Sequence, residues 1–135
     1  MVKKMIFVNL PVTEMQRSIK FYKALGFKQN MEFSNEKGTA MMWTDSIWVM
    51  LLQHAFYQQF LKGQVIADTK KASGSMTSFN LESIAAVKEF AQRAKENGGD
   101  FYHVEMDIPE DQMYELEIKD PDGNLLTVAW MPTPL

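Results

Sequence analysis

The 135-residue chain has no cysteine, only two histidines and no excess of basic residues. The lack of cysteine excludes a disulfide framework, thiolate catalysis and Cys-based zinc or iron–sulfur sites. A net charge of −3 with scattered lysines and arginines argues against nucleic-acid binding, which requires a basic patch. Long hydrophobic runs are also missing. The apolar start breaks at Pro11, too early for a signal peptide, and no run approaches the ~18 residues of a membrane span.

What is present is the composition of a globular protein, with 46% hydrophobic and 23% charged residues. A chain of this length can bury the core of one domain without disulfides or structural metals. We therefore expect a single cytoplasmic domain over residues 1–135, with no nucleic-acid and no membrane partner. Its eleven methionines suit irregular apolar space, either in a core or at an adaptable binding surface.

The first half of the chain, residues 4–53, predicts a strand, a helix and three further strands. Residues 4–12 are rich in β-formers, and Thr13 follows as a helix N-cap with Gln16 three residues later, a capping-box pattern. Apolar residues then recur at helical spacing until Gly26. The three strands are predicted over residues 27–34, 39–44 and 47–53.

The second half, residues 75–131, repeats this order about 70 residues later. A strand at 75–81 precedes Ser83, the expected N-cap of a helix with Ile84, Val87, Phe90, Ala91 and Ala94 on one face. Strands are then predicted over residues 100–106, 112–118 and 125–131. The connecting segment, residues 54–74, begins as a short amphipathic helix and continues as a polar linker.

The last strand is preceded by Asp-Pro-Asp-Gly at residues 120–123, which has the residue preferred at each position of a type I turn. Because side chains alternate along a strand, Leu125, Thr127 and Ala129 share one face, and the residues between them share the other.

The predicted fold class is therefore α+β, built from two βαβββ modules. Each module's sheet has a helix on one face and must cover the other. Two such sheets side by side form an incomplete barrel around a cavity, which is a common place for a small ligand.

Two segments of the sequence carry a resemblance to a known family. The stretch "FVNLPVTEMQRSIKFYKALGF" resembles the opening signature of the vicinal oxygen chelate (VOC) superfamily, and "DPDGNLL" resembles the turn before its last strand. This superfamily includes glyoxalase I, bleomycin-resistance and fosfomycin-resistance proteins, and extradiol dioxygenases. The segments "IWVMLLQHAFYQQF", "IADTKKA", "MYELEIKDPDG" and "VAWM" are similar to a bacterial branch described as predicted lactoylglutathione lyase.

The resemblance also implies where metal-using members place their ligands, which is on the cavity faces of four strands. Carried onto this sequence, these positions fall at Phe7, at Met50 or Leu52, at Met76 and at Thr127. Phenylalanine, leucine and methionine do not bind hard divalent ions, and a threonine hydroxyl is a weak neutral ligand. We therefore expect no metal cofactor at the usual site.

Other residues leave alternatives open. A relocated divalent-metal site would need His54 or His103 with Glu115 or Glu117, and the same His103, Glu115 and Glu117 are the candidates for acid–base catalysis. Acidic residues on an exposed strand are more often a solvated face. His54 is expected at the end of the fourth strand, and His103 on the sixth strand beside Glu105.

The favoured function is small-molecule binding without metal, by a homodimer, as the resemblance to bleomycin-resistance proteins implies. The alternative is a metal-dependent isomerase of the lactoylglutathione lyase type or a related VOC enzyme. The expected cavity residues are Phe7, Asn9, Met50, Leu52, Met76, Ser78 and Thr127, with His54, Phe56 and Tyr57 at the mouth. Trp43, Trp48 and Trp130 are expected either to stack on a ligand or to pack in the core.

Overall fold

A computed structural model describes residues 2–132 of the chain. It divides into two compact units, residues 1–68 and 69–135. The first unit contains β1 (Ile6–Val12), α1 (Met15–Ala24), β2 (Lys28–Asn30), the 3₁₀ helix η1 (Met31–Phe33), β3 (Gly38–Met42), β4 (Ile47–Gln53) and α2 (His54–Gln58). The second contains β5 (Met76–Asn80), α3 (Ile84–Glu96), β6 (Asp100–Tyr102), β7 (Tyr114–Lys119) and β8 (Leu125–Trp130). Among helices of the described residues, none has the length and hydropathy that a membrane span requires.

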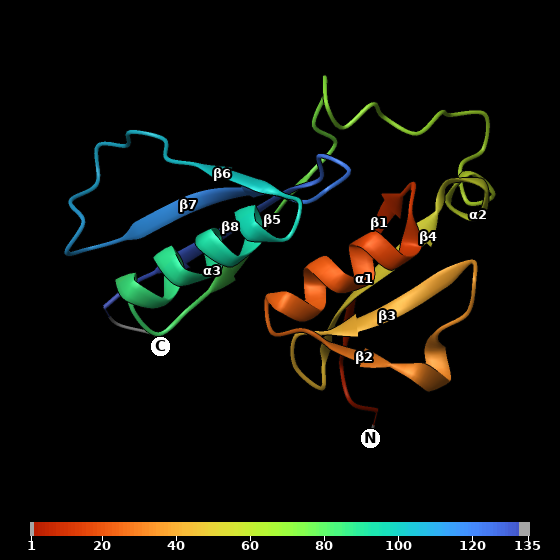
Figure 1. Cartoon of the computed structure of the whole chain (residues 1–135), viewed down its shortest axis with the longest axis horizontal. Helices are drawn as coiled ribbons and strands as arrows, with labels where there is room; N and C mark the ends of the chain where they lie inside the picture. The colour runs from red at the N-terminus through yellow and green to blue at the C-terminus, as the bar shows by residue number, and fades with distance from the viewer. Residues whose placement is uncertain (1, 133–135) are drawn as a thin grey trace. The chain divides into compact units, whose positions relative to one another are not determined.

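The first unit is a four-stranded mixed sheet with α1 along one face (Figure 1). The strand order is β1-β4-β3-β2, in which β1 and β4 are parallel and the other pairs antiparallel. The core lies between α1 and this sheet, where Phe21 and Tyr22 of the helix are fully buried, as are Met41 and Leu51 of the strands. Phe21 and Tyr22 meet edge to face, with ring centroids 5.0 Å apart.

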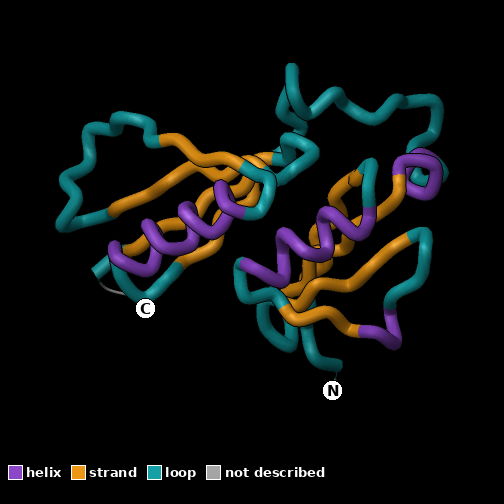
Figure 2. The backbone as a smooth tube through the Cα atoms, viewed as in Figure 1, coloured by secondary structure: helices purple, strands orange, loops and turns teal. Residues whose placement is uncertain are grey.

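The second unit repeats this architecture, with α3 along one face of a sheet in the order β5-β8-β7-β6 (Figures 1 and 2). Here β5 and β8 are parallel, and β7 is antiparallel to both of its neighbours. The predicted apolar stripe of α3 is buried at Val87, Phe90, Ala91 and Ala94. The sheet contributes these buried residues to the same core: Leu116, Ile118, Leu126 and Val128. The predicted α+β class and the two βαβββ modules are therefore confirmed.

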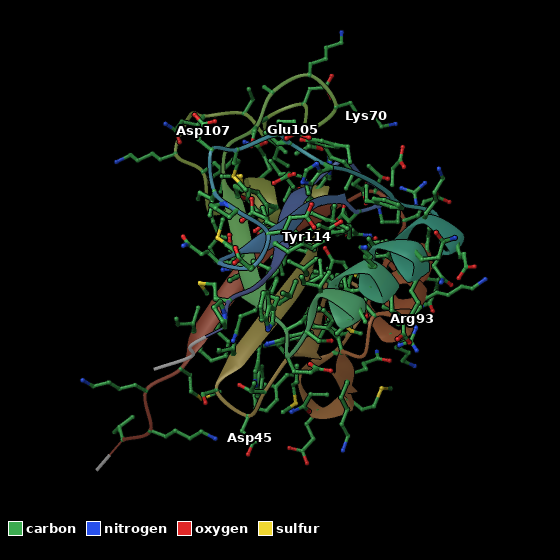
Figure 3. All side chains as sticks on the ribbon, turned by 90° about the vertical axis from the view of Figure 1, so that its left-hand side faces the viewer. Asp45, Lys70, Arg93, Glu105, Asp107 and Tyr114 are labelled. Atoms are coloured by element: carbon green, nitrogen blue, oxygen red, sulfur yellow. The ribbon has the colours of Figure 1, made fainter. Side chains whose placement is uncertain are left out.

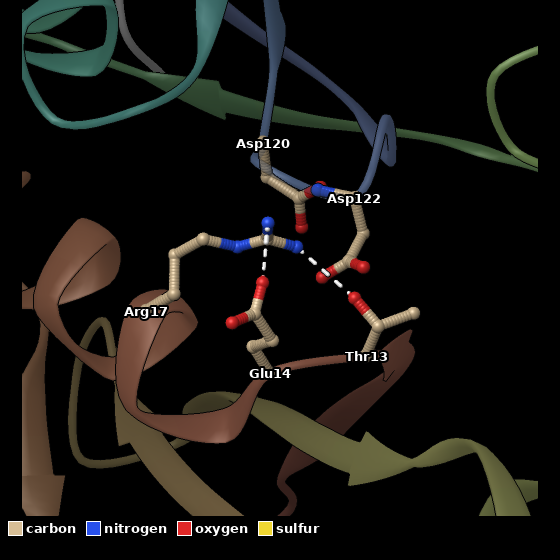
Figure 4. Close-up of polar contacts among 5 residues, drawn as sticks. All are labelled: Thr13, Glu14, Arg17, Asp120 and Asp122. Atoms are coloured by element: carbon tan, nitrogen blue, oxygen red, sulfur yellow. Dashed lines mark hydrogen bonds and ion pairs between the residues drawn. The ribbon is translucent and has the colours of Figure 1, made fainter.

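The two predicted helix caps have different outcomes. Ser83 caps α3 as predicted, because its side chain accepts a hydrogen bond from the Ala86 N–H at 3.0 Å. The prediction that Thr13 caps α1 was wrong, because the N-cap of α1 is Glu14 and its side chain makes no capping hydrogen bond. The Thr13 hydroxyl instead accepts a hydrogen bond from Arg17 at 3.0 Å, and Arg17 also pairs with Glu14 at 2.8 Å (Figure 4).

Two predicted strands are shorter than their sequence pattern. The strand predicted at 27–34 ends at Asn30, whose side chain accepts the Glu32 N–H at 3.1 Å and starts η1. Such side-chain bonds compete with strand pairing. The strand predicted at 100–106 ends at Tyr102, because β6 is an edge strand whose register with β7 covers only three residues.

The Asp-Pro-Asp-Gly turn forms at the predicted position between β7 and β8. The Gly123 N–H donates to the Asp120 carbonyl at 2.9 Å, and the buried Asp120 carboxylate accepts from the backbone N–H groups of Asp122 and Asn124, each at 2.9 Å. The Asn124 side-chain amide adds a third bond to this carboxylate at 2.9 Å. Thr69 closes the turn from the connecting segment by donating its hydroxyl hydrogen to the Asp122 carbonyl.

Gly123 is required at the end of this turn for two reasons. Its φ is +89°, and a Cβ there would lie 3.0 Å from the Thr69 carbonyl oxygen. Replacing Gly123 by alanine should therefore lower the free energy of unfolding by on the order of 2 kcal/mol. Urea unfolding followed by circular dichroism measures this loss. Gly74→Ala is the control, since no atom lies within 4 Å of its added Cβ. Equal midpoints for the two variants would contradict the prediction.

Candidate functional site

Each sheet has one face packed on its helix and a second face, which we call the open face. In the first sheet, Val49 and Leu51 are fully buried on the α1 side, so the alternate residues of β4 lie on the open face. The parallel register aligns Phe7 with Trp48, Asn9 with Met50 and Pro11 with Leu52. The predicted cavity residues of this half therefore share one face: Phe7, Asn9, Met50 and Leu52.

A pocket of about 250 Å³ lies where α2 and the residues after it meet the first sheet. Its walls are Asn9, Leu52, Tyr57, Phe60 and Leu61. Phe60 is held by Phe56, since the two rings meet edge to face with centroids 5.2 Å apart. The pocket thus combines aromatic and aliphatic walls with one side-chain amide.

Sequence reasoning found part of this pocket. It named Asn9, Leu52 and Tyr57, but it missed Phe60 and Leu61 in the connecting segment. The spacing of Phe56 and Phe60, four residues apart, was the available signal, because such residues lie on the same side of a helical turn.

The remaining predicted residues of this half lie elsewhere. His54 is exposed and lies directly after the last residue of β4, as predicted, where it begins α2. Phe7 is 49% exposed and meets Trp48 edge to face at a centroid distance of 5.3 Å. Trp48 is buried, and its indole N–H donates to the Asp45 carbonyl at 3.0 Å. Trp43 packs on Phe27, at a centroid distance of 5.0 Å.

The open face of the second sheet carries hydroxyl and carboxyl groups. The registers align Ser78 with Thr127, Thr127 with Glu117, and Glu117 with Tyr102 across the four strands. Thr127 is 1% exposed, and its hydroxyl donates to the Ser78 hydroxyl at 2.6 Å. Met76 lies on the same face of β5, two residues before Ser78, and is exposed.

Glu117 is the unexpected group on this face. The interpretation of Glu115 and Glu117 as a solvated face was wrong for Glu117, which is 5% exposed. Glu117 lies between Tyr102 of β6 and Thr127 of β8, and the backbone of Val104 in the loop after β6 bonds to its carboxyl group. Its Oε2 atom is buried and has no hydrogen-bond partner among the described residues. The pKa of Glu117 is raised to about 7, mainly by burial and also by the hydrogen bond to Glu115 and the charge of Glu115. Backbone N–H groups of Glu117 and Val104 act in the opposite direction.

His103 lies in the loop beyond β6, so its predicted place within a strand was wrong. Its Nδ1 atom is 3.8 Å from Glu105, and its ring stacks on Tyr114 with centroids 5.8 Å apart. Lys88 of α3 lies 5.4 Å above the Tyr114 ring, which places Tyr114 on the helix-covered side of β7, whereas Glu117 is on the open face. Figure 3 shows Tyr114 on its strand and Glu105 and Asp107 on the loop.

The family model of the Glyoxalase/Bleomycin resistance protein/Dioxygenase superfamily matches residues 4–128. The chain belongs to this superfamily. No curated protein matches it in sequence.

Solved structures share the fold. Hypothetical protein SA1046 from S. aureus is 25% identical with a TM-score of 0.76, and the match covers 96% of this chain and 94% of that one. Fosfomycin resistance protein FosX from Listeria monocytogenes is 15% identical with a TM-score of 0.67, over 100% and 96% of the two chains. The bleomycin resistance determinant encoded on transposon Tn5 is 18% identical with a TM-score of 0.59, over 97% and 100%.

The residues at the metal-ligand positions of the superfamily do not fit a divalent ion. Phe7, Met50, Leu52 and Met76 offer no hard donor, and Thr127 offers a neutral hydroxyl that is already bonded to Ser78. Glu117 is the carboxyl group nearest in register to Thr127. Among residues 2–132, no three His, Asp or Glu side chains come together as a metal-binding group.

The raised pKa of Glu117 predicts how the stability of this superfamily member depends on pH. The folded-state pKa of about 7 lies above the ordinary 4.5, so the folded protein holds a proton that the unfolded chain releases. Stability is therefore greatest below pH 4.5 with respect to this group and falls as pH rises through 7, by on the order of 3 kcal/mol. Glu117→Gln should be more stable than the wild type at pH 8 and similar to it at pH 5.

Urea unfolding at the two pH values measures this difference. Glu110→Gln, an equal change of charge at an exposed loop position, is the control and should leave the pH dependence unchanged. A Glu117→Gln variant whose stability falls between pH 5 and 8 as steeply as that of the wild type would show that Glu117 titrates normally.

Proposed function

We propose that this protein binds a small organic molecule in the pocket of its first sheet, without a metal cofactor. The observation that carries the proposal is the pocket of about 250 Å³ beside Asn9 and Leu52. Concave apolar sites with a few polar groups are the usual form of small-molecule sites. The lack of hard donors at the superfamily's metal positions supports binding by shape and apolar contact.

The walls of the pocket indicate what kind of ligand it accepts. Tyr57 and Phe60 offer aromatic surfaces, Leu52 and Leu61 offer aliphatic ones, and the Asn9 amide can both donate and accept a hydrogen bond. We therefore expect a largely apolar, flat molecule with one polar group directed at Asn9. Resistance proteins among the fold neighbours carry names that refer to bleomycin and fosfomycin, which is in keeping with a role in holding small molecules.

Homodimerisation, which the resemblance implies, stays a prediction. Exposed apolar side chains on edge strands support it, namely Ile6 and Phe7 of β1 and Met76 of β5.

A tryptophan substitution tests the pocket. The probe 8-anilinonaphthalene-1-sulfonate (ANS) should bind the wild type in EDTA, and Leu61→Trp should weaken that binding at least about tenfold because the indole fills the pocket. Titration of ANS fluorescence measures the change.

Val65→Trp is the matched control. It adds the same side chain to the same connecting segment at a position that is 83% exposed and does not line the pocket. Equal ANS affinity in the two variants, or no ANS binding by the wild type, would contradict the proposal.

The alternative is a metal-dependent isomerase of the lactoylglutathione lyase type, which needs a Lewis acid and a carboxylate base. Glu117, with a pKa of about 7, is the group of the described residues best suited to such proton transfer. The poor donor set makes us expect less than stoichiometric nickel, zinc or iron in the purified protein. We also expect no turnover of the methylglyoxal–glutathione adduct when these metals are added. Stoichiometric metal together with turnover would establish the isomerase.

A further inference from the structure

A buried acceptor without a donor is the feature of the second sheet that the pocket does not explain. Glu117 is only 5% exposed, and its Oε2 atom receives no hydrogen bond from the described residues. Buried polar atoms are nearly always paired, so an unpaired carboxyl oxygen indicates a missing donor. Its neighbours across the sheet do not supply one, since the Thr127 hydroxyl hydrogen is directed to Ser78.

The segment around Glu117 is strongly acidic. Residues 97–118 contain no lysine or arginine and hold these carboxylates: Asp100, Glu105, Asp107, Glu110, Asp111, Glu115 and Glu117. The loop that carries four of them contacts Glu117 through the backbone of Val104. Acidic side chains at the border of a buried carboxyl group create a negative potential that attracts cations and repels anions.

The titratable groups that share the open face of this sheet with Glu117 include only one cation. On β7 they are Glu115 and Lys119, and on β6 they are Asp100 and Tyr102, while β5 and β8 contribute no titratable side chain to this face. Lys119, the one cation among them, has its ammonium group 3.4 Å from the Gly123 carbonyl at the turn. No cation of this sheet is therefore directed to Glu117.

We propose that the open face of the second sheet binds an organic ammonium group, with Glu117 as its acceptor and Glu115 as the second carboxylate. An ammonium N–H satisfies the unpaired Oε2 atom, and its positive charge offsets the repulsion between the two carboxylates. A divalent metal fits less well, because such ions take additional protein ligands and no third His, Asp or Glu of the described residues joins this pair. The proposal goes beyond the pocket of the first sheet and does not depend on it.

Proton linkage makes this binding sensitive to pH. An ammonium group binds the ionised form of Glu117, whose pKa is about 7, so binding must release the proton that the free protein holds at lower pH. The ionised fraction rises about tenfold between pH 6 and pH 8. The affinity for an ammonium compound should rise by about the same factor.

The experiment compares three probes of similar size: benzylammonium, neutral benzyl alcohol and benzoate. Binding is followed by NMR of protein labelled with carboxyl-¹³C glutamate, which reports the titration of Glu117 directly. Benzylammonium should bind about tenfold more tightly at pH 8 than at pH 6 and should lower the pKa of Glu117. Benzyl alcohol and benzoate should do neither.

Two variants and one control locate the site. Glu117→Gln should lose both the pH dependence and the preference for the amine, whereas Glu36→Gln, at an exposed position of the first unit outside the acidic segment, should keep both. Leu61→Trp should also keep both, so failure of the pocket proposal and failure of this one are distinguishable.

Equal binding of the alcohol and the amine by the wild type would overturn the proposal, as would tighter binding of benzoate. Displacement of the amine by equimolar Mg²⁺ would overturn it in favour of a metal. If Glu117→Gln fails to fold, the wild-type titration of Glu117 with and without benzylammonium decides the question.

Discussion

One helix can cover only one face of a sheet. In each half of this protein, α1 or α3 packs on one face and buries the apolar residues there, such as Leu51 in the first sheet and Ile118 in the second. The alternation of side chains then places every second residue of each strand on the opposite face. The pocket, the Thr127–Ser78 hydrogen bond and the buried Glu117 all lie on these opposite faces. The helix-covered core therefore specifies the fold, and the open faces are left for chemistry.

The chain has the fold of its superfamily, whereas the residues that the sequence resemblance places at the metal positions carry no imidazole or carboxylate. The registers of β1 with β4 and of β5 with β8 align the side chains that correspond to a ligand set. Aromatic, aliphatic, thioether and hydroxyl groups at those positions cannot replace imidazole and carboxylate toward a hard cation. The fold alone therefore does not carry the function.

Glu117 illustrates a conflict between stability and use. A buried carboxyl group beside a second carboxylate is unfavourable when ionised, and an apolar residue at the same position of β7 would remove that cost. Groups held at an energetic disadvantage inside a fold occur preferentially at functional sites.

The sequence by itself determined the parts of the structure that depend on local rules. The Ser83 cap, the apolar stripe of α3 and the turn at residues 120–123 each follow from the preferences of neighbouring residues, and each was predicted. The family resemblance, together with alternation along single strands, likewise assigned Asn9, Leu52 and Thr127 to the faces they occupy. Local rules failed where a side chain had a choice of partner, as at Thr13 and Asn30.

Only the tertiary structure decided which strand lies inside a sheet and which segment covers it. Glu115 and Glu117 look equivalent in sequence, but only Glu117 has strand neighbours on both sides, Tyr102 of β6 and Thr127 of β8, and only Glu117 is buried. The spacing of Phe56 and Phe60 predicts only that they share one side of a helical turn, and Phe60 and Leu61 become pocket walls because the chain after α2 returns to the sheet. Burial and pKa depend on residues that are distant in the chain, so they cannot be predicted from neighbouring residues in the sequence.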